Sequence, residues 1–222
     1  MNSRRTFLAQ ALSLSIGAMA GGALTAAVHP GAAAAAQAGK AEAAAAQDAD
    51  ASRPFITLPE PDHKRGIPLM EALSLRKSTR KFRATELQLQ YVSNILWAAF
   101  GVNRPDGKRT IPTARNQQNL IVYAAMQNGV WRYLPETHEL IQEVFLNLCE
   151  LLGNAPLTLG YAAQGEYGGM HAGSAYQNVG LYCASAGLGN VVKATGLNVM
   201  AEYITPPPEY KLLILQSVGW PG

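Results

Sequence analysis

The sequence gathers three cations and a serine hydroxyl within five consecutive positions, Arg76-Lys77-Ser78-Thr79-Arg80. An arginine offers a planar fork of donors, a lysine a point charge and a serine a short hydroxyl, which together suit one phosphate and a neighbouring polar ring. Pro68 and the apolar residues after it predict a short helix that ends at this cluster. The cluster predicts a pocket for a phosphorylated cofactor. A solvated basic turn is the alternative interpretation.

Two further segments carry groups that suit a flat ring. The loop over 112–118, Pro-Thr-Ala-Arg-Asn-Gln-Gln, stands immediately before a predicted strand, and its amides hold both donors and acceptors. A plain polar loop is the alternative there. In the segment over 187–196, Gly196 would let the backbone approach a ligand closely. A third polar run, Tyr176-Gln177-Asn178, lies within a predicted helix, where capping of a neighbouring loop is the simpler explanation.

Hydrophobic periodicity predicts the elements that position these segments. Asn128-Gly129 between two apolar runs is a strong hairpin signal. The helix over 172–188 has small residues and few charges, so we expect it to be buried nearly all round. The whole order predicts one α+β domain with a central sheet and helices on its faces. Further helices are predicted over 86–100, 138–152 and 197–203, and strands over 120–126, 130–134, 156–163, 190–194 and 212–218.

Composition restricts the class of protein. Arg4 and Arg5 are the only charged residues in 1–36, so the formal net charge of +3 falls to +1 without that segment. A net charge so close to zero gives no indication of nucleic-acid binding. Cys149 and Cys183 form no close pair, and the histidines show no ligand spacing, so no metal site is predicted. A disulfide between the cysteines is possible in an oxidising compartment. Two buried free thiols on helices are the preferred interpretation.

The N-terminus has the layout of an export signal. Ser3-Arg4-Arg5-Thr6-Phe7-Leu8 precedes an apolar stretch of small residues over 11–27. The paired arginines before Phe-Leu resemble the twin-arginine motif, which implies export of a folded protein, often with its cofactor loaded, to the periplasm. An ordinary signal peptide or a membrane anchor is the alternative. We expect a signal over 1–36, a flexible Ala-rich linker over 37–54 and a folded domain over 55–222.

The order and spacing of these segments resemble the nitroreductase-like family of flavoproteins, which bind FMN. The resemblance runs from Leu69 to Pro221. It includes the cluster over 76–82, the loop over 112–118, the helix with its Gly-Leu-Gly end at 187–189 and the final Ser-Val-Gly-Trp-Pro. The loop over 101–110, with the Asn-Gly hairpin, looks like the branch that includes peptide azoline dehydrogenases. The resemblance implies a mostly antiparallel sheet flanked by helices, and a homodimer with the flavin at its interface.

The resemblance also implies roles for the basic residues. Arg76, Lys77 and Ser78 match contacts to the phosphate and ribityl chain. Arg80 matches a cation near the flavin N1 and C2 oxygen, where positive charge favours the reduced flavin. Many members carry basic residues after the last strand, and this sequence has none there. Lys193 is therefore a further candidate for the phosphate.

Two backbone segments complete the implied site. In the family, one loop lies against the flavin across the dimer interface, and the segment after a later strand faces N5, where hydride enters and leaves. The loop corresponds here to Thr113, Ala114, Asn116 and Gln118, and the later segment to Ala194, Thr195 and Gly196. No catalytic side chain is implied.

The expected function is that of an FMN-dependent oxidoreductase of nitroreductase type. Hydride or electrons would pass through the flavin to a flat acceptor, such as a nitroaromatic, a quinone or a peptide ring. The sequence identifies no electron donor. The alternatives are a non-redox flavin-fold protein that binds or breaks down flavin, a binding module that has lost the cofactor, and a structural periplasmic domain.

Overall fold

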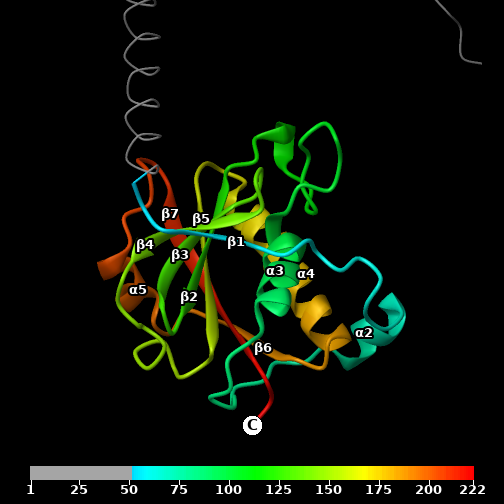
Figure 1. Cartoon of the computed structure of the whole chain (residues 1–222). Coiled ribbons are helices and arrows are strands. Elements are labelled where there is room, and N and C mark those ends of the chain that lie inside the picture. Colours follow the sequence, from blue (N-terminus) through cyan, green and yellow to red (C-terminus); the bar gives the residue numbers. More distant parts are fainter. Residues whose placement is uncertain (1–51) are drawn as a thin grey trace, which may run out of the picture. The chain divides into compact units, whose positions relative to one another are not determined.

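The computed structural model describes residues 52–222, so the predicted signal and nearly all of the predicted linker lie outside the described residues. Within them, seven strands form one antiparallel sheet in the order β1-β4-β3-β2-β5-β7-β6 (Figure 1). The strands are β1 (Phe55–Thr57), β2 (Leu120–Met126), β3 (Gly129–Leu134), β4 (Glu139–Val144), β5 (Leu157–Ala163), β6 (Gly189–Lys193) and β7 (Lys211–Gly219). The predicted α+β class is confirmed.

Helices cover both faces of this sheet. α3 (Leu89–Phe100) and α4 (Gly168–Ser185) lie on one face, and α5 (Leu197–Tyr203) lies on the other (Figure 1). α2 (Leu69–Leu75) packs on the outside of α4. A single 3-10 turn, η1 (Ala114–Asn116), precedes β2.

Alternation along the strands divides the core between the two faces. In β2, Val122 and Ala124 pack under α3 and α4, whereas Tyr123 and Ala125 pack on the α5 side. Leu159 on the interior strand β5 is fully buried in the first layer, and burial of such a side chain contributes about 1.5–3 kcal/mol. The sheet is therefore a rigid platform between two apolar layers.

The helix predicted over 138–152 is wrong, because β4 occupies its first half. Leu140 and Ile141 pair with β3 on one side and β1 on the other. Phe145, which the helical pattern placed inward, has 74% of its surface exposed. As a strand, β4 satisfies backbone hydrogen bonds of both β3 and β1. Because β1 lies more than 80 residues earlier in the sequence, local periodicity could not indicate this pairing.

α4 is buried along one face only, so the expectation of burial nearly all round is wrong for a single chain. The buried positions His171, Ala175, Val179 and Cys183 recur at helical spacing, while Gln177 on the opposite side is exposed. The small residues and low charge of α4 therefore do not mean that its outer face is buried within one chain. They mean that this exposed face carries almost no charge. Within residues 52–222, no helix is long and apolar enough to cross a membrane.

Both cysteines are buried free thiols, as preferred from the sequence. Cys183 lies on α4, but Cys149 lies in a turn after β4 and not on the predicted helix. Burial raises the pKa of both thiols, so both are held in the protonated form at neutral pH. Residues 52–222 contain no cluster of His, Cys, Asp or Glu that could hold a metal ion.

Arg109 is a buried cation in the loop between α3 and β2. Its side chain is 5% exposed, and its Nη2 donates a hydrogen bond to the Glu136 carboxylate. The guanidinium carbon lies 5.0 Å from the centre of the Phe100 ring. The Nε and Nη1 groups have no hydrogen-bond partner among the described residues. The carboxylate of Glu136 is therefore the main compensation for a buried charge.

We expect Glu136→Ala to lower the free energy of unfolding by about 1–3 kcal/mol, because it leaves a buried cation without its acceptor. Arg109→Met should change stability less, since it removes the buried charge itself and leaves Glu136 in contact with water. Urea unfolding followed by tryptophan fluorescence compares the two variants. A larger loss for Arg109→Met would contradict this account of the pair.

Candidate functional site

The basic segment 76–80 is fixed against α4 and β6. The Arg76 N–H donates to the Ala72 carbonyl at 2.9 Å, which ends α2. The stem of Arg76 lies against Gly180, since a Cβ built there would stand 3.7 Å from Arg76 Cδ. The Thr79 N–H donates to the Asn190 carbonyl at 2.8 Å, and Ser78 forms a parallel bridge with the same residue. The segment therefore runs beside the start of β6.

A buried polar network holds the start of β6 in place. Gln216 is fully buried, and its Nε2 donates to Asn190 Oδ1 at 3.0 Å and to the Tyr176 carbonyl at 3.1 Å. Gln216 Oε1 accepts from the Tyr161 hydroxyl at 2.6 Å. Because both the amide nitrogen and the amide oxygen of Gln216 are hydrogen-bonded, this network is expected to be rigid. The network connects β5, through Gln216 on β7, to β6, the strand beside which the basic segment runs.

The polar side chains of the basic segment have no partner inside the fold. Among residues 52–222, Arg76, Lys77, Ser78 and Arg80 make no side-chain hydrogen bond or ion pair, and Lys77 and Arg80 are exposed. Three cations and a hydroxyl without internal counter-charge fit a phosphate group well. A cavity of about 210 Å³ lies beside the segment. Its lining residues are Leu75, Lys77, Thr79, Ala184, Gly187, Leu188, Asn190 and Pro221.

The other end of β6 carries the predicted segment 194–196. β6 is the last strand of the sheet, and within the described residues its outer edge makes only the bridge to Ser78. Gly196 has φ +86°, a left-handed conformation that favours glycine, and it begins α5. The distance along a strand from Asn190 to Ala194 is about 13 Å. The basic segment and the 194–196 backbone thus border one open sheet edge.

Lys193 is held by the turn that follows β4. Its Nζ donates a hydrogen bond to the Leu152 carbonyl, and burial lowers the pKa of its ammonium group. The ammonium would have to leave that carbonyl to reach a ligand, so a phosphate contact by Lys193 stays a prediction.

The loop over 113–118 lies at the opposite end of α4. The Ala114 N–H donates to His171 Nε2 at 2.9 Å, near the start of the helix. Arg115, Asn116 and Gln118 all have positive φ, between 49° and 53°, which is unusual for residues other than glycine. Strain of this kind gathers at functional sites. In the sequence, the only signal for His171 is a polar residue at a core position of the helical pattern, so its role could not be predicted.

One chain does not bring all the predicted residues together. Arg76 contacts α4 at Gly180, and the loop contacts it at His171, nine residues earlier, which corresponds to about 14 Å along the helix. The basic segment and the 194–196 backbone share one edge, whereas the loop is at the other end. Asn178, the other polar candidate, caps the carbonyls of Ala98 and Thr110, as the simpler explanation predicted.

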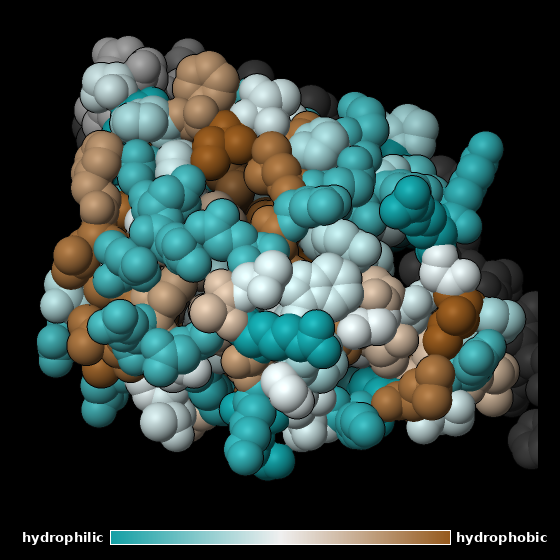
Figure 2. Space-filling view, turned by 60° about the horizontal axis from the view of Figure 1, so that its bottom comes forward, coloured by the Kyte–Doolittle hydropathy of each residue, from teal (hydrophilic) through white to brown (hydrophobic). Residues whose placement is uncertain are grey.

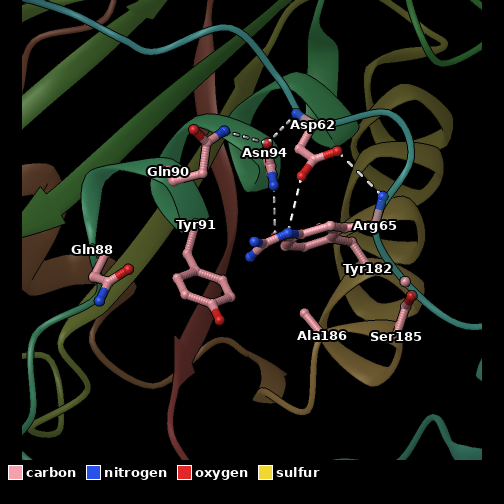
Figure 3. Close-up of a pocket in the computed structure, with 10 residues that line it drawn as sticks. Asp62, Arg65, Gln88, Gln90, Tyr91, Asn94, Tyr182, Ser185 and Ala186 are labelled. Carbon is pink, nitrogen blue, oxygen red and sulfur yellow. Dashed lines mark hydrogen bonds and ion pairs between the residues drawn. The ribbon is translucent and has the colours of Figure 1, made fainter.

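A second cavity of about 460 Å³ lies between the segment 62–66, the start of α3 and the end of α4 (Figure 3). Asp62 and Arg65 form an ion pair of 3.1 Å at its rim, so their charges cancel. Asn94 accepts from the Asp62 N–H and donates to the Tyr182 hydroxyl at 3.0 Å. None of the predicted cofactor-binding residues lines this cavity, and sequence analysis missed it because its walls come from three separate segments.

Comparison with known proteins gives the family. A protein of Methanocaldococcus jannaschii, provisionally named a nitroreductase, is 30% identical in an alignment of length 177 that covers 67% of this chain and 89% of the relative. The crystal structure of a provisionally named nitroreductase of Ralstonia eutropha JMP134 is 36% identical and superposes with a TM-score of 0.70 over 76% of this chain and 90% of that one. No protein-family model matches.

The chain therefore belongs to the nitroreductase family. More distant structures share the fold. A Desulfovibrio desulfuricans protein in complex with FMN is 17% identical, with a TM-score of 0.52 over 70% of this chain and 87% of that one. A Bacteroides fragilis nitroreductase with bound FMN is 12% identical, with a TM-score of 0.52 over 70% and 89% of the two chains.

Proposed function

We propose that the protein is an FMN-dependent oxidoreductase. The observation that carries the proposal is the unpaired basic segment 76–80 fixed beside the open edge of β6. Proteins of the same fold have been crystallised with FMN, which supports a flavin as the anionic ligand. Arg76, Lys77 and Ser78 would hold the phosphate and ribityl chain. The backbone of 194–196 would border the flavin ring.

Bound FMN would supply hydride and electron transfer, and the residues of the chain would bind and orient it. Arg80 is an exposed cation without an internal counter-charge, so it would stabilise negative charge on a ring beside it. No acidic or nucleophilic side chain has to act on the acceptor in this proposal. We propose a flat acceptor, a nitroaromatic, a quinone or a peptide ring of the azoline type.

We further propose a homodimer in which a second copy supplies the loop 113–118. Four apolar side chains of α2 are exposed, Leu69 by 63%, Met70 by 74%, Leu73 by 43% and Leu75 by 53%. Figure 2 brings the end of the molecule near β6 forward and shows apolar side chains at the right, where α2 lies in Figure 1. This surface and the open outer face of α4 would be buried by the second copy. The paired arginines near the N-terminus support export of the loaded dimer to the periplasm.

The purified protein should be yellow, with the absorbance bands of an oxidised flavin, or should take up one FMN per chain when titrated. Chemical reduction should bleach these bands, and a nitroaromatic or a quinone should restore them. A colourless protein that binds no added FMN would refute the proposal. A yellow protein whose reduced form reacts with no acceptor would instead favour flavin binding without redox turnover.

A further inference from the structure

His171 is a buried histidine with a defined proton position. Its side chain lies within the core next to the start of α4, and the residue is 2% exposed. Its Nε2 must be unprotonated, because the Ala114 N–H can only donate to it. The proton is therefore on Nδ1, which donates to Asn119 Oδ1 at 2.6 Å. Asn119 Nδ2 in turn donates to the Gln164 carbonyl at 2.6 Å, which fixes the orientation of the amide.

This chain of hydrogen bonds ends on the strained loop 113–118. Within residues 52–222, the bond from Ala114 to His171 is the hydrogen bond that joins the loop to α4. The remaining bonds of the loop are to itself or to the adjacent Gly107 carbonyl. Three residues with positive φ within four positions, Arg115, Asn116 and Gln118, need support from outside the loop, since the free chain would relax to commoner conformations.

We propose that neutral His171 is a positioning residue that holds the loop 113–118 in its binding conformation, and that protonation of His171 releases the loop. A second proton on Nε2 would place two donors, Nε2–H and the Ala114 N–H, face to face, so this hydrogen bond would be lost. The consequence for FMN rests on the proposed function, in which this loop borders the flavin.

The surroundings of His171 favour the neutral form. Burial lowers the pKa of His171 below its ordinary value of 6.5, and no charged group adds to that effect. A cavity of about 440 Å³ lies beside Asn119, the partner of His171, and its ionisable lining residues are Arg115, Glu166, Tyr167 and Glu209. The folded-state pKa of His171 is thus lower than its unfolded-state pKa. The stabilisation by neutral His171 is therefore complete above pH 6.5, and it is lost as the pH falls through the lower, folded-state pKa.

Two variants separate the roles of shape and charge. Gln at position 171 can offer an oxygen to the Ala114 N–H and cannot be protonated, whereas Leu fills similar space and offers no acceptor. His63→Gln is the matched control, because His63 is an exposed histidine outside the loop. His138 is half-buried, and burial lowers its pKa too, but His138 is present in every variant, so its contribution cancels in the comparison.

Amide hydrogen exchange of the loop, measured without FMN from about pH 7.5 to about pH 5, tests the positioning role directly. At each pH the comparison between variants removes the ordinary pH dependence of exchange. We expect His171→Leu to exchange roughly tenfold faster at Ala114 at all pH values. The unmodified protein should approach this rate only at low pH, and His171→Gln should stay protected throughout.

FMN titration of the same variants gives the second readout. His171→Leu should bind FMN roughly tenfold more weakly, and the affinity of His171→Gln should fall less at low pH than that of the unmodified protein. Equal exchange at Ala114 in all variants would overturn the inference. If exchange behaves as expected but no variant binds FMN, the role of His171 in the loop stands and the proposed function fails. Circular dichroism checks that His171→Leu is folded, and His171→Gln keeps the test valid if it is not.

Discussion

Replacing Gly129 by alanine should lower the free energy of unfolding by about 3–4 kcal/mol, a large share of the 5–15 kcal/mol typical of a domain. Gly129 begins β3 with φ +129°, a conformation open almost only to glycine. A Cβ at this position would also overlap the Val144 carbonyl oxygen, which belongs to the paired strand β4. The backbone would have to shift next to the turn that sets the register of β2 and β3.

Gly107→Ala is the matched control. Gly107 also has positive φ, +73°, but no atom lies within 4 Å of a Cβ built there. It should therefore lose only the conformational part, about 1–2 kcal/mol. Urea unfolding of both variants, followed by tryptophan fluorescence, measures the difference. Equal losses would mean that the β2–β3 hairpin can adjust around the extra methyl group.

This hairpin was predictable because its signal is local. Asn128-Gly129 and the two apolar runs beside it indicate the hairpin, and β2 and β3 form as expected. The turn itself is one residue earlier than the Asn-Gly pair, at Gln127 and Asn128, because Gly129 already pairs with Met126. The next element was predicted wrongly for the opposite reason. Leu140 and Ile141 are adjacent and both buried, because parts of the chain distant in sequence cover β4 on both sides. Adjacent apolar residues fit a helix better than an alternating strand, so local spacing favoured the wrong element.

The same distinction applies to the candidate site. The sequence identified the segment 76–80 because its cations are contiguous, and the structure adds what fixes it, Asn190 and the buried Gln216 from more than 100 residues away. The sequence could not indicate the positive φ of Arg115, Asn116 and Gln118, since none of them is a glycine. His171 was missed because a single buried histidine has meaning only through its partners, Ala114 and Asn119.

Arg76→Ala should weaken FMN binding by about 10- to 150-fold, because a charge-assisted contact to a phosphate contributes about 1.5–3 kcal/mol. The backbone bond that ends α2 does not involve the side chain, so the helix should remain. Lys211→Ala removes one positive charge from an exposed position at the start of β7 and should leave the affinity unchanged. Fluorescence titration with FMN compares the variants.

A packing defect could also weaken binding, since the stem of Arg76 lies against Gly180 on α4. Arg76→Met keeps most of that stem and removes the charge, so it should lose as much FMN affinity as Arg76→Ala. Riboflavin, which has no phosphate, separates the two causes further. If Arg76 binds the phosphate, the variants should weaken FMN binding but leave riboflavin affinity unchanged, because a lost contact affects only the ligand that makes it. Equal weakening of both ligands would show that Arg76 supports the shape of the site, and unchanged FMN affinity would mean that the segment is a solvated turn.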